Sequence, residues 1–494
     1  MPNRESAIAR AEAFFDDGGF RARLTELVAV PSTSQDPGHE TDLWRYLRDF
    51  IGPWLQRMGF SSEIHVNPLS GFGPILTAER IEDPARPTIL TYGHGDTVRG
   101  LEDQWRAGLN PWTLTVEGDR WYGRGTADNK GQHALNLSAL EAVLAERGGK
   151  LGFNLKIVLE TAEERGSQGL REFVAAHREK LAADVLIASD GPRVMPETPT
   201  IATGSRGTFH FDLIVDLRPG GVHSGHWGGL TTDPAVVLAH AIACICDRHG
   251  KILVRDWLPN GGKPPNGKPA GNASAVPTNV RVALDGCIVG GGAESATIDP
   301  DWGEPGLSAA EKIYGWTGFI VLAMLSGRPE NPVNAVAPNA RAHCQIRYTI
   351  DSDPETFSAA LRQHLDAHGF PEVKIEGAYV RMNASRTDPA APWVQWAVAS
   401  METTRTGQIG PARRVQVIPN ASGGLPGDVF IDHLGVPLIW VPHSYNGCKQ
   451  HGPDEHFLAG PAREGIAAFA GLWWDLGEAG TPLRAGSDDA ARES

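Results

Sequence analysis

The sequence predicts an α/β protein: a mainly parallel sheet with helices on both faces, plus an inserted ferredoxin-like α+β domain. Three observations support this fold class. Apolar strand patterns alternate with helical patterns up to Arg206, a β-α-β-β-α-β order follows, and strand–helix alternation returns from about Ala391. The chain has 494 residues, which is too long for one ordinary core, so we expect two domains.

The pattern in the first part of the chain predicts helices and short buried strands. A helix is predicted at Glu5–Val30, and helical periodicity recurs at Gly131–Arg147 and Gly169–Ala183. Short apolar runs with turn residues behind them predict strands at Thr88–Tyr92, Leu155–Glu160, Asp184–Ser189 and Pro437–Val441. Strands that alternate with helices indicate a mainly parallel sheet.

The middle of the chain follows a different pattern, which is typical of a small separate domain. In order, it predicts a strand, a helix, two strands, a helix and a strand, at Thr208–Leu217, Asp233–Arg248, Asn279–Leu284, Arg341–Ile350, Pro354–His368 and Glu372–Val380. We therefore predict one domain made of residues 1–206 and 383–494, with residues 207–382 inserted into it. The Gly/Pro/Asn-rich stretch Pro259–Asn272 reads as a loop, and the tail after Glu478 is predicted to be disordered.

Composition and charge exclude several functional classes. The net charge of −14 argues against binding nucleic acid through a broad basic surface. No run is long and apolar enough to span a bilayer, and the N-terminus lacks the apolar core of a signal peptide. Five scattered cysteines without a C-x-x-C pair indicate reduced, mostly buried thiols, so we expect a cytoplasmic protein without nucleic-acid or membrane partners.

Acidic and imidazole side chains follow several predicted strands or occupy a glycine-rich turn. Taken singly, each has a structural explanation, such as a helix N-cap, a solvated histidine or surface charge. In open α/β sheets, however, ligands bind outside the carboxyl ends of the strands, where these segments can converge. Two imidazoles with carboxylates and no thiolate suit zinc, manganese or cobalt. The residues are His94 and Asp96 in TYGHGDTV, Asp128 in YGRGTADNKG, Glu163 and Glu164 in LETAEERGS, Asp190 in LIASDGP, and His451 in CKQHGPDEH.

Six strings in this sequence resemble the M20 family of metallopeptidases, and most closely its dipeptidase branch, the carnosine dipeptidase-like enzymes. The resemblance covers nearly the whole chain, and the long string ending in ADNKG is highly specific. In family order the strings are GHGDTV, PWTLTVEGDRWYGRGTADNKG, ETAEERGSQGL, ASDGP, GVHSGHWGG and QHGPDEH.

The resemblance implies two bridged divalent ions per chain, with zinc expected and manganese or cobalt as alternatives. Asp128 would bridge both ions. His94 and Asp190 would complete one site, while Glu164 and His451 would complete the other. All these positions match the family pattern, so residues 1–206 and 383–494 would form the catalytic domain.

The resemblance also assigns catalytic and binding roles. Asp96 would orient the imidazole of His94, and Glu163 would be the general base. His223 matches a histidine that stabilises the oxyanion and, in dimeric relatives, reaches the partner's active site. Arg347 matches an arginine that clamps a substrate carboxylate, although it could be a surface residue of a lid strand. We therefore predict a homodimer that associates through the inserted domain, or lid, at a sheet edge or helix face left by Thr208–Leu217 and Arg341–Ile350. The alternative is a monomer whose His223 reaches its own site when the lid closes.

Two segments depart from the family pattern. The dipeptidases usually have a G-G-S-I-P turn where this chain reads SGGLP at residues 422–426. Gly423 and Gly424 are still predicted to contact the substrate, but the loss of the serine puts carboxylate recognition by this turn in doubt. The stretch Gly318–Leu325 is more apolar than expected, which favours a substrate with a larger or more hydrophobic group.

Three functions remain open at this point. The first is hydrolysis of dipeptides or short peptides, and the second is hydrolysis of N-acyl amino acids by the same metal site. The third, a catalytically silent binding protein, is disfavoured because Glu163 and every ligand position are retained. The sequence does not name the substrate.

Overall fold

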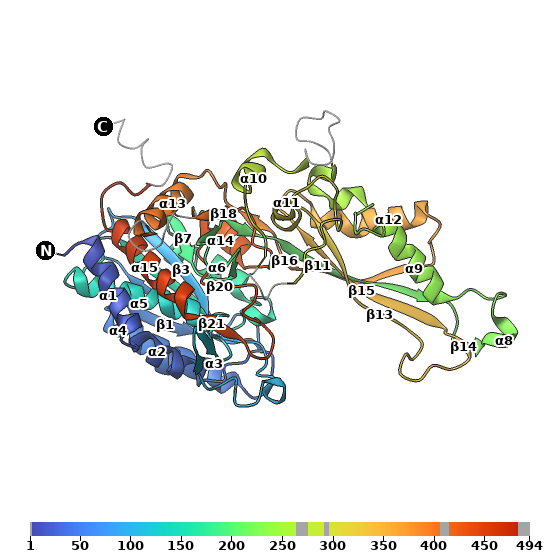
Figure 1. Ribbon diagram of the computed structural model, residues 1–494, viewed down its shortest axis with the longest axis horizontal. Helices are drawn as coiled ribbons and strands as arrows, with labels where there is room; N and C mark the ends of the chain where they lie inside the picture. The colour runs from blue at the N-terminus through green and yellow to red at the C-terminus, as the bar shows by residue number, and fades with distance from the viewer. Residues whose placement is uncertain (1, 263–274, 291–295, 406–413, 483–494) are drawn as a thin grey trace.

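Two sheets lie one after the other along the long axis of the molecule (Figure 1). The computed structural model describes residues 2–262, 275–290, 296–405 and 414–482. Most of the stretch Pro259–Asn272 and most of the tail after Glu478 lie outside these ranges. Within them, no helix has the length and apolar character needed to cross a membrane.

The larger sheet has eight strands in the order β1-β2-β6-β3-β7-β19-β9-β18. The central neighbours β6, β3, β7 and β19 are parallel, as is the pair β9–β18, while β1, β2 and the β19–β9 contact are antiparallel. The predicted mainly parallel sheet is therefore confirmed. Its strands are β1 (Ser61–His65), β2 (Ile75–Arg80), β3 (Thr88–His94), β6 (Asn154–Glu160), β7 (Val185–Ala188), β9 (Thr200–Ala202), β18 (Gln416–Ile418) and β19 (Leu438–Trp440).

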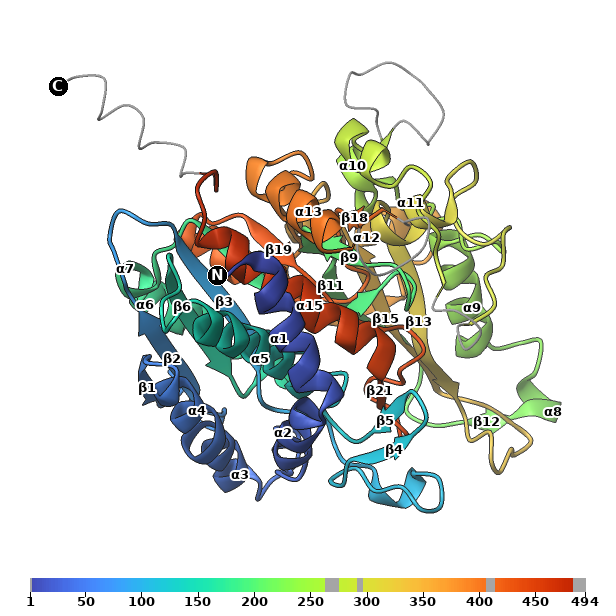
Figure 2. The same cartoon turned by 60° about the vertical axis from the view of Figure 1, so that its left-hand side comes forward.

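Helices cover both faces of this sheet, as predicted. Figure 2 shows α1, α5 and α15 side by side on one face, so the helices nearest the two ends of the chain lie together there. The helices of this face include α1 (Arg4–Asp16), α2 (Gly19–Val28), α4 (Gly52–Arg57), α5 (Lys130–Glu146), α13 (Pro392–Arg405) and α15 (Ala459–Leu476). Those of the other face are α6 (Leu170–Ala176), α7 (Arg178–Leu181) and α14 (Gly427–Leu434).

The single helix predicted at Glu5–Val30 is wrong, because it is two helices. Gly18 separates α1 from α2 with a φ of 83°, a left-handed conformation that glycine adopts without strain. The helix predicted at Gly169–Ala183 is likewise divided, with His177 between α6 and α7. In both places the apolar periodicity continues across the break, which is why the sequence pattern missed it.

The second sheet is antiparallel and has the order β13-β15-β11-β16. Helices α9 and α12 pack against it (Figure 1). The elements are β11 (Gly207–Asp216), α9 (Pro234–Ile245), β13 (Gly318–Ser326), β15 (Asn339–Tyr348), α12 (Phe357–Ala367) and β16 (Lys374–Met382).

Two predictions for this second sheet are wrong. Residues Asn279–Leu284 were expected to form a strand, but they belong to helix α10 (Thr278–Ala283) and its C-cap, and the second strand is β13. The alternation of valines in this segment resembles a strand, yet only Val280 is buried within the helix. Strands β11 and β15 were expected to leave an edge, but they are the inner strands and the edges are β13 and β16.

The apolar core continues from the large sheet into the second one. One cluster lies between the large sheet and the α1, α5 and α15 face. The other runs from the opposite face, at Leu186 and Trp440, to Phe211 and Trp257 beside the second sheet. The second sheet thus lies beside the carboxyl ends of the strands of the large sheet. There, strands β11, β15 and β16 contribute side chains to one wall of a cavity.

Candidate active site

Three neighbouring parallel strands deliver chemically active side chains to one place. Strand β3 ends on His94, and β6 is followed by a turn that carries Glu163 and Glu164. Strand β7 is followed by Asp190. Because β6, β3 and β7 are adjacent and parallel, their carboxyl ends meet at one edge of the sheet.

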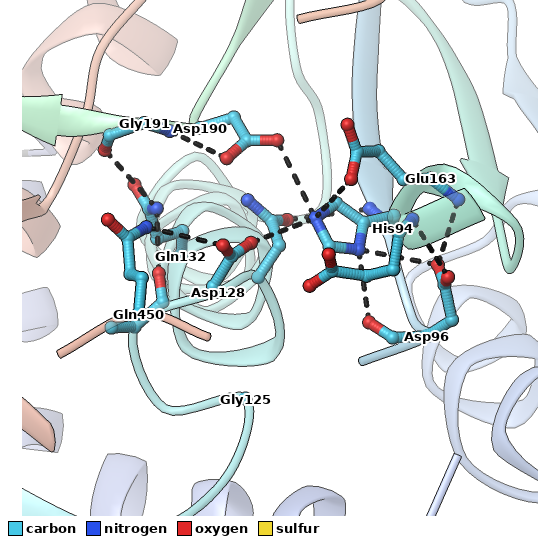
Figure 3. A network of polar contacts seen from close by, with 12 residues as sticks. His94, Asp96, Gly125, Asp128, Gln132, Glu163, Asp190, Gly191 and Gln450 are labelled. Atoms are coloured by element: carbon cyan, nitrogen blue, oxygen red, sulfur yellow. Dashed lines mark hydrogen bonds and ion pairs between the residues drawn. The ribbon is translucent and has the colours of Figure 1, made fainter. Parts of the chain in front are cut away.

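Asp128 lies between two groups of side chains and offers one oxygen to each. Its Oδ1 is 3.1 Å from Nε2 of His94, which is also 3.6 Å from Oδ2 of Asp190 (Figure 3). Its Oδ2 is 3.1 Å from Nε2 of His451, which is also 3.2 Å from Oε2 of Glu164. Ligand atoms within each group lie within 4.8 Å of one another, close enough to bind a metal ion.

The residues of both groups fit divalent cations. Within the described residues, the buried atoms Oε1 of Glu164 and Oδ2 of Asp190 make no hydrogen bond. Burial raises the pKa of Glu164, and it raises the pKa of Asp190 to about 7. Buried carboxylates crowded together in this way stay ionised only when cations offset their charge, and two groups that each contain an imidazole offer ligands for such cations. Imidazole and carboxylate ligands without a thiolate suit zinc, manganese or cobalt.

Asp96 fixes the orientation of both the histidine and the glutamate turn. Nδ1 of His94 lies 3.0 Å from the backbone oxygen of Asp96 and 3.4 Å from its carboxylate. The same carboxylate accepts hydrogen bonds from the backbone nitrogens of Glu163, at 3.2 Å, and Glu164, at 3.1 Å (Figure 3). Asp96 therefore positions side chains on two different strand ends.

The adjacent glutamates have different surroundings. Glu164 contacts His451, whereas Oε2 of Glu163 comes no closer than 4.0 Å to the imidazole of His94 and lines the cavity. Burial raises the pKa of Glu163 well above its ordinary value. Among the described residues Glu163 has no close basic partner, and a carboxylate with a raised pKa binds a proton more readily than a free glutamate, as a general base requires.

The sequence analysis missed Glu455, which supports the loop that carries Asp128. One oxygen of Glu455 accepts hydrogen bonds from the backbone nitrogens of Gly125, Ala127 and Asp128 at 3.0–3.1 Å. Its other oxygen is 2.7 Å from the buried guanidinium of Arg124. The signal was present in the string QHGPDEH, whose two acidic residues, Asp454 and Glu455, have no metal-ligand role to explain them.

A cavity of about 370 Å³ adjoins these side chains. Its predicted lining residues Arg347, Gly423 and Gly424 lie there, and Arg347 donates hydrogen bonds to Thr208 and Gln345. The sequence analysis missed other members of the wall. These are His210, Arg381 and Gln450, the last of which approaches Asp128 at 3.4 Å (Figure 3).

Other sequence-predicted positions do not reach this cavity. His223 is exposed, next to α8 (Ser224–Trp227) at the far end of the second sheet, and is not among the residues that line the cavity (Figure 1). The apolar stretch Gly318–Leu325 lies in edge strand β13, outside the cavity. That stretch therefore gives no structural reason to expect a larger or more hydrophobic substrate group. The five cysteines are free, as expected, but only Cys344 and Cys448 are buried.

Residues 90–475 match the model of Peptidase family M20/M25/M40. The chain is 30% identical over 378 residues to a cysteinylglycine-S-conjugate dipeptidase of Corynebacterium striatum, covering 75% of this chain and 77% of that protein. Its fold is similar to that of the dipeptidase Dug1p of Saccharomyces cerevisiae, with a TM-score of 0.73, 19% identity and coverage of 97% and 100% of the two chains. Human carnosine dipeptidase 1 gives a TM-score of 0.69, 19% identity and coverage of 96% and 100%.

The fold and the site are therefore those of a metal-dependent hydrolase. The chain belongs to peptidase family M20/M25/M40. The resemblance drawn from the sequence strings is confirmed, and so is the expectation of an enzyme.

Proposed function

We propose that this protein is a dipeptidase that works with two divalent cations, zinc being the expected metal. The observation that carries the proposal is the position of Asp128, which offers one carboxylate oxygen to each of two histidine–carboxylate groups. The similarity to a named dipeptidase over three quarters of the chain supports peptide hydrolysis over the alternative, hydrolysis of N-acyl amino acids.

Each ligand in this proposal comes from the two groups described above. His94, Asp128 and Asp190 would hold one cation, and Asp128, Glu164 and His451 the other. When bound, such a pair of ions polarises the scissile carbonyl and makes water nucleophilic near neutral pH.

The remaining chemistry belongs to side chains of this protein. Within the described part of the chain, Glu163 lines the cavity without an ion-pair partner closer than 4.0 Å, so it can take the proton of the attacking water and pass it to the leaving amine. Asp96 keeps the turn of Glu163 in place. Arg347 is the donor for the C-terminal carboxylate of the substrate, because a guanidinium binds a carboxylate with two parallel hydrogen bonds.

A small substrate fits the dimensions of the site. A cavity of about 370 Å³ is near the lower end of the range for small-molecule sites, roughly 300–1,000 Å³. Gly424 belongs to this wall, and a Cβ at this position would come 2.6 Å from the sulfur of Met382. The glycine thus lets the 422–426 turn approach the second sheet closely, a task that does not depend on the missing serine.

The chain is divided into two domains in this proposal. Residues 1–206 and 383–494 would form the catalytic domain, and residues 207–382 a lid that also mediates dimerisation. The separate antiparallel sheet of the middle segment and its contribution of Arg347 to the cavity support this division. Free thiols at all five cysteines favour the cytoplasm as the compartment.

A panel of dipeptides and N-acetyl amino acids tests the proposed reaction. After loading with zinc, manganese or cobalt in parallel, we expect the protein to hydrolyse dipeptides with kcat/KM at least about 100-fold above the N-acetyl amino acids. A site that hydrogen-bonds a polar group of its substrate rejects analogues without that group by more than this factor. Release of free amino acids is measured by chromatography. Preference for N-acetyl amino acids would support the alternative function, hydrolysis of N-acyl amino acids. No turnover of either substrate class would contradict both functions.

The lid presents a surface suited to a second copy of the chain. Edge strand β13 exposes Ile320, Val321, Leu322, Met324 and Leu325. An exposed apolar edge of this length invites pairing with another strand. A two-fold axis would cover both copies of β13 at once, and we propose a homodimer formed in this way.

The position of His223 supports the same assembly. It lies at the far end of the lid and does not line the cavity of its own chain. We therefore propose that it stabilises the oxyanion in the partner's active site, a task that needs a preorganised donor.

Mixing two inactive variants, His223→Ala and Glu163→Gln, tests this exchange of side chains. A mixed dimer has one site with both residues intact and one site that lacks both. Random exchange of equal amounts should restore about a quarter of the wild-type activity, since half the dimers are mixed and each has one intact site. Activity is measured before and after exchange.

Exchange is verified by mass spectrometry of differently tagged subunits. Leu322→Glu serves as the matched control, because a charge on β13 should give a monomer by sedimentation and prevent recovery. No recovery despite verified exchange would contradict a role of His223 across the interface.

A further inference from the structure

The wall of the cavity that faces the carboxylates is positively charged. Arg347 comes from β15 and Arg381 from β16, and β11 lies between these strands. Within the part of the chain that the structure describes, neither guanidinium forms an ion pair with a carboxylate. Opposite them lie Glu163 and the proposed metal ligands. The cavity thus has an acidic side for cations and a basic side for anions.

A β-bulge aims Arg381 into this cavity. Strand β16 pairs with β11 through Thr208 and Met382, and next through Phe209 and Val380, so Arg381 is the extra residue between two paired positions. Regular alternation would send Arg381 and Met382 to opposite faces, but both line the cavity. Bulges of this kind redirect single side chains beside functional sites.

The two arginines differ in how many N–H groups remain available to hydrogen-bond a substrate. Arg347 uses Nε on Gln345 and Nη1 on Thr208, which holds the group in place. Burial, and after it the charge of Arg381, lowers the pKa of Arg347. His210 lies in the same wall, and burial, aided by His343, lowers its pKa to about 4, so it adds no positive charge near neutral pH.

The side chain of Arg381 also lies close to the turn of the general base. Its Cγ and Nε are 3.9 Å from the point where a Cβ on Gly166 would stand, and Gly166 follows the Glu163–Arg165 turn. The lid arginine therefore lies between the second sheet and the turn that follows β6, beside the cavity. Two guanidinium groups facing one cavity repel each other until anionic groups enter between them.

We propose that Arg381 forms a subsite for an acidic side chain, so that the preferred substrates are dipeptides with a C-terminal glutamate or aspartate. This inference rests on the proposed dipeptidase function. Such a substrate carries two carboxylates at its C-terminal residue, one for Arg347 and one for Arg381. Each guanidinium then gains a charge-assisted pair in a partly enclosed site, where such bonds are stronger than in water.

Isosteric substrate pairs test the subsite. For zinc-loaded wild-type protein we expect kcat/KM for Ala-Glu to exceed that for Ala-Gln by about 10-fold or more, the usual range for a hydrogen bond to a charged group. In Arg381→Gln the ratio should fall to about one. Lys374→Gln removes a positive charge from the same strand outside the cavity, and it should keep the wild-type ratio.

A second role of Arg381 would give a different result in this experiment. If Arg381 shares the terminal carboxylate with Arg347 instead, Arg381→Gln weakens both substrates equally and the ratio does not change. That result would overturn the acidic subsite, and so would a wild-type ratio near one.

A binding measurement separates this inference from the proposed function. In zinc-loaded Glu163→Gln, calorimetry should give a Kd for Ala-Glu about 10-fold below that for Ala-Gln, and adding Arg381→Gln should remove the difference. A binding difference without any turnover by the wild-type protein would contradict the dipeptidase function and leave the subsite standing. Turnover with no charge preference would leave the function and overturn the subsite, and the absence of both effects would overturn both.

Discussion

Replacement of Glu163 by glutamine should lower kcat by about 10²–10⁴-fold, the usual contribution of a general base, while the fold and both metal ions are retained. The amide has nearly the same shape as the carboxylate but cannot accept the proton of water. Glu163 lies 4.0 Å from the imidazole of His94 and belongs to neither group of proposed ligands, so its charge is not needed to hold a cation. Steady-state kinetics and metal analysis on the same preparation measure the two effects.

Glu164→Gln is the matched control at the adjacent residue. Its carboxylate lies 3.2 Å from His451 and has a second buried oxygen without a hydrogen bond. We expect this variant to lose one ion per chain together with activity. Loss of metal from Glu163→Gln, with retention in Glu164→Gln, would mean that the two roles are exchanged.

Removal of metal should abolish hydrolysis and lower the Tm. The carboxylates of Asp128, Glu163, Glu164 and Asp190 line one cavity, and without cations they repel one another. A ligand at 100 times its Kd stabilises the folded state by about 2.7 kcal/mol, so loss of two ions should produce a clear shift in thermal unfolding. Exhaustive chelation followed by scanning calorimetry measures the shift, and addition of zinc, manganese or cobalt should reverse it.

His451→Ala provides the control for the number of ions. His451 has an exposed side chain at 59%, so its removal should leave the core intact while one ion is lost. Wild-type protein should bind two ions per chain under saturating zinc. A measured stoichiometry of no more than one, or unchanged activity after chelation, would contradict the two-ion site.

The candidate metal site followed from the sequence because three of its five proposed ligands occupy strand ends. His94 ends β3, and Glu164 and Asp190 follow β6 and β7. Parallel neighbours bring their carboxyl ends to one edge of the sheet, so alternation of strands and helices was enough to expect convergence. The strings around these residues also carried the family resemblance, which residues 90–475 bear out.

The order of the lid strands could not be obtained from local pattern. Asn279–Leu284 alternates like a strand but lies in helix α10 and its C-cap, whereas the apolar β13 is an exposed edge strand. Alternation reports which side chains share a face only after a segment has become a strand. Which segment does so depends on its partners in the sheet, and those are distant in sequence.

The sequence by itself determined the fold class, the family and the set of strand-end residues, because short-range periodicity and specific strings encode them. Tertiary structure alone decided that Glu455 holds the loop of Asp128 and that a bulge aims Arg381 at the cavity. The physical reason is that these features depend on orientations of side chains brought together from distant strands. A register shift between two strands changes such an orientation without leaving a pattern in the sequence.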